Sequence, residues 1–157
     1  MVEPIETLFP SLRNSLFQIT SPAARDYNCI AWAAGDTTRW WWPAPDTDVA
    51  YWPAGVDLEE TLDAFVAAFA TLGYAPCADE ESEPGYQKVA LFAMALVPTH
   101  AARQLPSGRW TSKLGLREDI EHDLQAVSGD VYGKVVMLLK RPHSSASSLP
   151  RLPSIGT

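Results

Sequence analysis

The sequence predicts an α+β domain with a small antiparallel sheet. Residues 27–34 and 58–72 place apolar side chains at helical spacing. Residues 88–97, 99–105 and 109–115 then follow one another as strands separated by short turns, which is typical of a β-meander. Helices and strands are therefore grouped along the chain, and this grouping favours an α+β arrangement over a parallel α/β sheet.

Composition indicates one globular domain and excludes one class of partner. The chain has 157 residues, of which 46% are hydrophobic and 20% charged, close to the average of globular proteins. Its formal net charge is −7, from 12 Lys and Arg against 19 Asp and Glu. Binding to a nucleic-acid backbone selects for a basic face, so no nucleic acid is expected. A peptide, an amide, another small molecule or a protein is the expected partner.

The two ends of the chain differ in composition from its middle. Residues 1–24 combine apolar side chains with three prolines, which predicts an arm that docks on the body without regular structure throughout. Residues 25–142 hold the predicted helices and strands and form the expected domain. Residues 143–157 are rich in serine and proline and are expected to be a flexible tail.

The sequence predicts a cytoplasmic protein with free thiols. Glu3 and Glu6 stand where a signal peptide carries positive charge, and no apolar stretch is long enough to span a membrane, so no membrane partner is expected. The two cysteines, Cys29 and Cys77, make no disulfide framework and match no zinc-binding spacing. Neither a metal nor another cofactor is predicted.

The first predicted helix has a cysteine in its first turn. Asp26 or Asn28 can cap this helix, and Gly35 can end it. In that position the helix dipole favours a thiolate, which makes Cys29 a candidate nucleophile. The alternative is that Cys29 packs in the core, since free cysteine is among the most buried residue types.

A proline-interrupted loop, residues 39–53, holds four of the six tryptophans. Such a loop can close over the core, form the wall of a substrate groove next to the cysteine, or bind a partner. The candidate substrate-binding side chains are Trp32, Trp40, Trp41, Trp42 and Gln104.

The second predicted helix is expected to be a scaffold that faces the core. Asp57 and Glu60 form a capping-box pattern at its start, and Gly73 supplies its end. Its apolar residues share one face of the helix and are Leu58, Leu62, Phe65, Val66, Phe69 and Leu72.

His100 opens the second predicted strand and is the candidate general base for Cys29. With a three-residue turn at 106–108, His100 shares a face of the sheet with Ser112 and Gln104, and either can then orient the imidazole ring. Glu118 and Asp119 are further candidates from the following element. With a two-residue turn the register slips by one residue, and Thr111 takes that face instead. The sequence leaves both registers open.

Two further elements complete the predicted domain. Residues 118–127 are expected to form a helix with His122 on its surface, because apolar residues recur there at helical spacing after an acidic start. Residues 132–140 are expected to be a buried final strand.

Several basic side chains lie in or near the meander. Arg103, Arg109 and Lys113 are candidates to bind a carboxylate or a phosphate, and the alternative is a solvated strand face.

The order of these elements carries a resemblance. A cysteine at a helix start, a scaffold helix and a histidine leading an antiparallel meander resemble papain-like cysteine hydrolases, especially the compact NlpC-type amidases and peptidases. The resemblance implies that Cys29 is the nucleophile and His100 the general base. NlpC-type enzymes usually carry histidine, asparagine or aspartate on the next strand, whereas this chain has Ser112 near that place. This departure implies a variant triad, a dyad or an inactive relative.

A second resemblance rests on five sequence blocks. The blocks NCIAWA, THAARQL, WTSKLG, EDIEHDL and YGKVV together resemble an uncharacterised bacterial domain family over residues 27–142.

Two functions are therefore expected as alternatives. The first is a thiol hydrolase or acyl transferase that acts on an amide or ester bond through Cys29 and His100. The second is a catalytically inactive papain-like binding or adaptor module that recognises a partner through the tryptophan-rich loop. The enzyme predicts an open cleft with Cys29 near His100, and the module predicts a buried thiol and an exposed aromatic patch.

Overall fold

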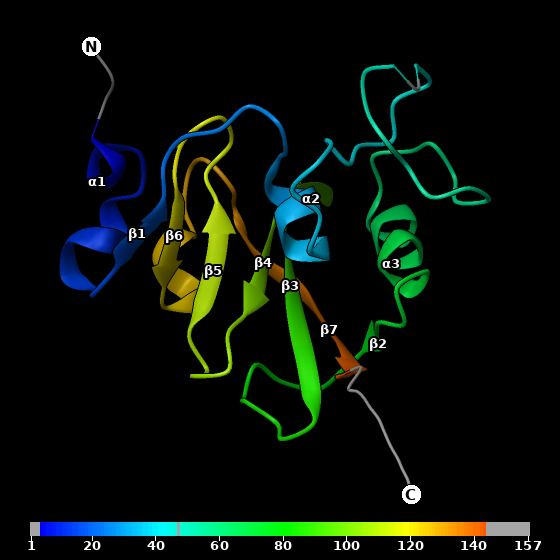
Figure 1. The fold of residues 1–157 in the computed structure, drawn as a ribbon. Helices are drawn as coiled ribbons and strands as arrows, with labels where there is room; N and C mark the ends of the chain where they lie inside the picture. The colour runs from blue at the N-terminus through cyan, green and yellow to red at the C-terminus, as the bar shows by residue number, and fades with distance from the viewer. Residues whose placement is uncertain (1–3, 47, 144–157) are drawn as a thin grey trace, which may run out of the picture.

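The computed structural model describes residues 4–46 and 48–143, which form one sheet with helices packed on it (Figure 1). The α-helices are α1 (Ile5–Leu8), α2 (Cys29–Ala34) and α3 (Leu62–Ala70), and the 3-10 helices are η1 (Pro10–Asn14) and η2 (Leu124–Val127). The strands are β1 (Gln18–Ser21), β2 (Ala75–Pro76), β3 (Tyr86–Met94), β4 (Val97–Gln104), β5 (Trp110–Lys113), β6 (Asp119–His122) and β7 (Lys134–Pro142). The α+β class is confirmed.

The strands pair antiparallel in the order β1-β6-β5-β4-β3-β7-β2. Helices α2 and α3 cover one face of this sheet, whereas the N-terminal arm and η2 pack on the other (Figure 1). Alternation along β3 and β4 divides the core accordingly. Leu91 and Ala101 pack toward α2 and α3, and Phe92 and Ala102 pack toward the arm.

Helix α2 begins and ends through local capping. Asn28 is its N-cap, since the side-chain oxygen accepts a hydrogen bond from the backbone N–H of Ala31 at 3.1 Å. Gly35 ends the helix in the left-handed conformation, with φ at 86°. Of the two predicted caps, Asn28 is therefore the one used, and Cys29 is the first helical residue.

Helix α3 starts later than the capping-box pattern predicted. Its N-cap is Thr61, whose hydroxyl accepts a hydrogen bond from the backbone N–H of Ala64 at 3.2 Å. The backbone oxygen of Asp57 instead accepts a hydrogen bond from the indole of Trp52 at 2.9 Å, which holds this segment as a loop. The predicted capping box at Asp57 and Glu60 is wrong.

The helix predicted at 118–127 is also wrong. Residues 119–122 form β6, which pairs with β5 on one side and β1 on the other, and η2 follows it. The apolar residues that suggested helical spacing, Ile120, Leu124 and Val127, all reach the same core through a strand and a 3-10 turn. Pairing with two neighbouring strands overrides the local helical pattern.

The N-terminal arm is more regular than its prolines predicted. Ile5, Phe9 and Leu12 are buried in the core on the arm side of the sheet, and β1 supplies the edge strand beside β6. The predicted tail, residues 143–157, lies outside the described residues except for His143.

Candidate binding pocket

Cys29 is the first residue of α2 and packs among apolar side chains. Its side chain is 8% exposed and lies in the core beneath α2 and α3. Burial raises the pKa of the Cys29 thiol to about 11, although the backbone N–H groups of Ala101 and Ile30 oppose this shift. The thiol is therefore protonated at neutral pH, and its position at the helix start does not activate it.

His100 forms a hydrogen bond with Ser112 and none with Cys29. Because Ala101 faces α2, its neighbour His100 points to the other face of the sheet. There its ring stacks on Tyr132 at a centroid distance of 3.8 Å and packs edge-on against Phe92 at 5.2 Å. Its Nε2 lies 2.9 Å from Ser112 Oγ, and its Nδ1 has no hydrogen-bond partner. The pairing of Cys29 with His100 therefore stays a prediction, and Tyr132, which stacks on His100, also lines the cavity beside Cys29.

Ser112 does share a face with His100, as one of the two open registers predicted. Strand β5 pairs with β4 through Gln104 opposite Trp110 and Arg103 opposite Thr111. This register brings Ser112 to the arm-side face, where it joins His100 to His122. Sequence reasoning missed the role of His122 because it placed this residue on a helix surface, whereas β6 buries it.

The direction of these hydrogen bonds follows from one backbone carbonyl. His122 Nδ1 lies 2.7 Å from the oxygen of Asp123, which only accepts, so Nδ1 carries the proton. Nε2 of the neutral His122 then accepts from the Ser112 hydroxyl at 2.6 Å, and Ser112 Oγ accepts from His100 Nε2–H at 2.9 Å. We call His100, Ser112 and His122 the histidine chain.

The histidine chain is buried and electrically neutral. Burial lowers the pKa of His122 to about 4, and burial together with the nearby His122 lowers the pKa of His100 well below its ordinary value. All three side chains have no exposed surface. The histidine chain therefore links β4, β5 and β6 within the core and offers no base to Cys29.

A cavity of about 390 Å³ opens beside Cys29, between α2 and the tryptophan-rich loop. We call it the tryptophan pocket. Aromatic and small apolar side chains dominate its lining, and among them are Cys29, Trp40, Trp42, Val49, Ala50 and Tyr132. Tyr132 comes from the segment before β7 and was not predicted from the sequence, because nothing local links it to a loop far earlier in the chain.

The loop that forms the tryptophan pocket is anchored by Trp41. This side chain is 3% exposed, and its indole N–H donates to Asp36 Oδ2 at 2.9 Å. Asn28 holds the backbone of Trp41 from both sides, donating to its oxygen at 2.9 Å and accepting from its N–H at 3.0 Å. Asn28 thus caps α2 and fixes the loop at once, which makes the pocket pre-formed.

The predicted substrate-binding residues divide between pocket and core. Trp40 and Trp42 line the tryptophan pocket, and the indole N–H of Trp40 donates to the oxygen of Arg25 at 2.7 Å. Trp41 is an anchor, and the indole of Trp32 donates to Thr111 Oγ1 at 3.0 Å on the sheet. Gln104 is buried away from the pocket, where it donates to the oxygen of Glu80 at 2.8 Å.

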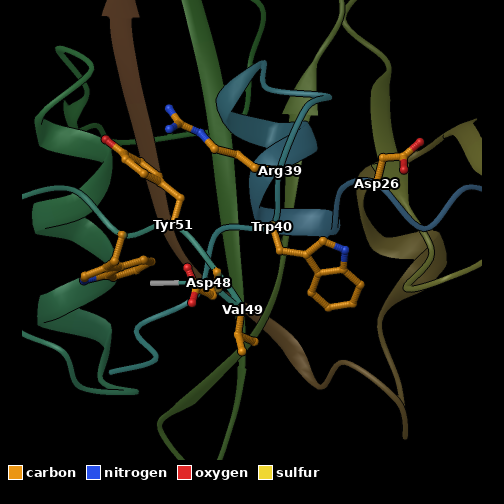
Figure 2. Close-up of a pocket in the computed structure, with 8 residues that line it drawn as sticks. Asp26, Arg39, Trp40, Asp48, Val49 and Tyr51 are labelled. Carbon is orange, nitrogen blue, oxygen red and sulfur yellow. The ribbon is translucent and has the colours of Figure 1, made fainter. Parts of the chain in front are cut away.

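A second cavity, with charged side chains, adjoins the first. Its lining includes Asp26, Arg39 and Asp48, and it shares Trp40 and Val49 with the tryptophan pocket. In the view of Figure 2, Trp40 and Val49 lie between Asp26 on one side and Tyr51 on the other. The tryptophan pocket therefore has an apolar interior and a charged neighbour at its rim.

The charge of Arg39 at this rim is largely compensated. Its guanidinium lies 3.5 Å from the ring centroid of Tyr51, and its Nε donates to Asp36 Oδ2 at 2.8 Å. Hydrogen bonds from Thr38, Trp41 and Arg39 outweigh the effect of burial and hold the pKa of Asp36 well below its usual range. Asp36 therefore stays ionised and keeps both the arginine and the loop in place.

Within residues 4–46 and 48–143, no group of three or more His, Cys, Asp or Glu side chains is arranged to hold a metal ion. In the same part of the chain, no helix has the length and apolar character needed to cross a membrane.

One family model matches the chain. It carries the description "Domain of unknown function (DUF7689)" and matches residues 18–140, from the start of β1 into β7. No curated protein and no solved structure matches. The prediction of an uncharacterised domain family is confirmed.

Proposed function

The chain belongs to the family described as a domain of unknown function (DUF7689), and we propose from its own geometry that it is a non-catalytic binding module. The tryptophan pocket is its binding site, and the occupant is an apolar or aromatic group of a peptide or small molecule. The observation that carries this proposal is the cavity of about 390 Å³ with its aromatic and apolar lining.

Size and rigidity support this function. Ligand pockets typically enclose roughly 300–1,000 Å³ and are lined mainly by apolar and aromatic side chains. The loop is held by the paired hydrogen bonds between Asn28 and Trp41, so little conformational entropy is lost when a ligand enters. At the rim, Val49 is 66% exposed and is accessible to a group that enters the pocket.

The competing thiol hydrolase has less support. A papain-like mechanism needs a base in contact with the thiol. The pKa of Cys29 is raised to about 11, and His100 Nε2 is engaged with Ser112 on the other face of the sheet. The buried thiol fits the binding module, whereas the tryptophans of the loop are buried or half-buried and form no exposed aromatic patch.

The proposal is tested with indole as the probe. Saturation-transfer NMR with the full chain should detect indole bound to the protein, with the signal decreasing when a larger apolar competitor is added. The Val49→Asp variant places a charge at the rim and should weaken indole binding about fivefold, the equivalent of losing roughly half of a buried valine contact.

Leu58→Asp is the matched control. Leu58 is also exposed, at 54%, but does not line the tryptophan pocket. Its substitution should leave indole binding unchanged. Absence of any indole signal, or an equal loss in both variants, would contradict the proposed site.

A further inference from the structure

Two arginines lie at the opposite end of α2 from the tryptophan pocket. Arg103 on β4 donates from Nε to the oxygen of Trp32, in the last turn of α2, at 3.4 Å. Arg141 on β7 donates from Nη1 to the oxygen of Leu72, just after α3, at 2.9 Å. Each guanidinium thus donates to a backbone carbonyl in the last turn of a helix or just after a helix, and neither forms a second hydrogen bond within the described residues.

Sheet register places these two arginines on the same face. Arg103 lies opposite Val89 of β3, and Val89 lies opposite Leu139 of β7. Arg141 is two residues beyond Leu139, so its side chain projects from the same face of the sheet. Both arginines therefore flank β3 on the side that α2 and α3 cover.

Tyr74 completes the group. It is 3% exposed, its ring centroid lies 4.7 Å from the guanidinium carbon of Arg141, and its hydroxyl has no hydrogen-bond partner among residues 4–46 and 48–143. Both arginines act electrostatically on this hydroxyl, and Arg141 lowers the pKa of Arg103 in addition to the larger effect of burial. Arg141 therefore packs on the ring of Tyr74, and Arg103 lies across β3 from them on the same face of the sheet.

Two other arginines of the chain do have carboxylate partners. Arg109 pairs with Glu121 at 2.9 Å and Asp123 at 2.8 Å, and Arg39 pairs with Asp36 at 2.8 Å. Within the described part of the chain, no acidic side chain lies within 4.0 Å of Arg103 or Arg141. Asp119 raises the pKa of Arg103 without forming an ion pair with it, so the positive charge of the two arginines is only partly compensated.

We propose that Arg103, Arg141 and Tyr74 form a site for an oxyanion, the phosphate or carboxylate group of a small ligand. An oxyanion accepts several charge-assisted hydrogen bonds at once and offsets the repulsion between the two guanidinium groups. It also supplies the acceptor that the Tyr74 hydroxyl lacks. This site is separate from the tryptophan pocket and does not depend on the function proposed for it.

The test is an NMR titration of the full chain, in which the arginine Nε–H signals are followed as inorganic phosphate or acetate replaces chloride at constant ionic strength. The signals of Arg103 and Arg141 should move together with one saturation midpoint. Those of Arg39 and Arg109, which already have carboxylate partners, should stay in place. A response to phosphate alone assigns a phosphate group, and a response to acetate assigns a carboxylate.

Variants keep the test falsifiable. Tyr74→Phe retains both arginines and removes one hydrogen bond to the anion, so it should weaken the response about fivefold. Arg103→Gln should abolish it, whereas Arg39→Gln should preserve it. The proposal is overturned when neither anion shifts the two signals, or when Arg39→Gln reduces the response as much as Arg103→Gln.

Discussion

The reactive side chains on the two faces of the sheet have different surroundings. On one face, Cys29 lies beneath an apolar cavity that opens beside the tryptophan-rich loop. On the other face, the histidine chain is closed, with His100, Ser112 and His122 hydrogen-bonded to one another and without exposed surface.

This difference shows how a strand separates neighbours in sequence. Ala101 contacts the cysteine side, and His100, one residue earlier, belongs to the opposite side. The sequence places a cysteine at a helix start and a histidine at a strand start. Whether these two residues can pair depends on which face of the sheet the histidine side chain occupies. Here the open face can receive a ligand, and the closed face uses its polar groups to join strands.

The largest expected effect is that of pH on the free energy of unfolding, through the buried His122. Burial lowers the folded-state pKa of His122 to about 4, whereas an unfolded histidine titrates near 6.5. As the pH falls, the unfolded chain binds the proton first. The contribution to stability is thus complete above about pH 6.5 and is lost towards pH 4, by about 3 kcal/mol for His122 alone.

Urea unfolding at a series of pH values measures this loss. In His122→Gln the free energy of unfolding should decrease less steeply between pH 6.5 and 4 than in the unaltered chain. His143→Gln, which alters an exposed histidine, should leave the slope unchanged. Equal slopes in the unaltered chain and His122→Gln would contradict a buried neutral histidine.

The next prediction concerns the rate at which Cys29, beside the tryptophan pocket, is alkylated. With the pKa of Cys29 raised from 9.0 to about 11, the thiolate fraction at pH 8 is about 100-fold lower than for an unshifted thiol. Iodoacetamide should therefore label Cys29 slowly in a Cys77→Ser background, with a rate that still rises above pH 9. The rate is followed by mass spectrometry.

His100→Gln sharpens this measurement. Because His100 lies on the other face, the substitution should not slow the labelling of Cys29. If Cys29 is labelled rapidly below pH 8 and His100→Gln slows this labelling, Cys29 and His100 form a reactive pair. That result would support the hydrolase hypothesis.

A smaller effect is expected from breaking the histidine chain at its centre. Ser112→Ala leaves His122 Nε2 without a donor and His100 Nε2–H without an acceptor. We expect a loss of about 2 kcal/mol in the free energy of unfolding, measured by urea titration at pH 7.5. The exposed Ser82→Ala is the control and should change little. If Ser112→Ala lowers the free energy of unfolding by less than about 0.5 kcal/mol, the histidine chain contributes little to stability.

Prediction from the sequence succeeded where neighbouring residues decide the structure. The helix carrying Cys29, the meander and the final strand depend on capping and on apolar spacing within each segment. It was wrong at residues 118–127, where pairing with β1 and β5 selected a strand over the helix that the spacing indicated. It also did not separate the anchor Trp41 from the pocket-lining Trp42, although the two are adjacent.

The sequence by itself determined the α+β class, the cysteine at a helix start and the aromatic loop, because each is encoded within a short stretch of chain. Only the tertiary structure decided which face of the sheet each polar side chain occupies and which distant residues meet. Alternation along a strand gives two equivalent faces, and the choice between them depends on packing against elements far away in the chain. For that reason His100 bonds to Ser112 in the core, and Tyr132 both stacks on His100 and lines the pocket beside Cys29.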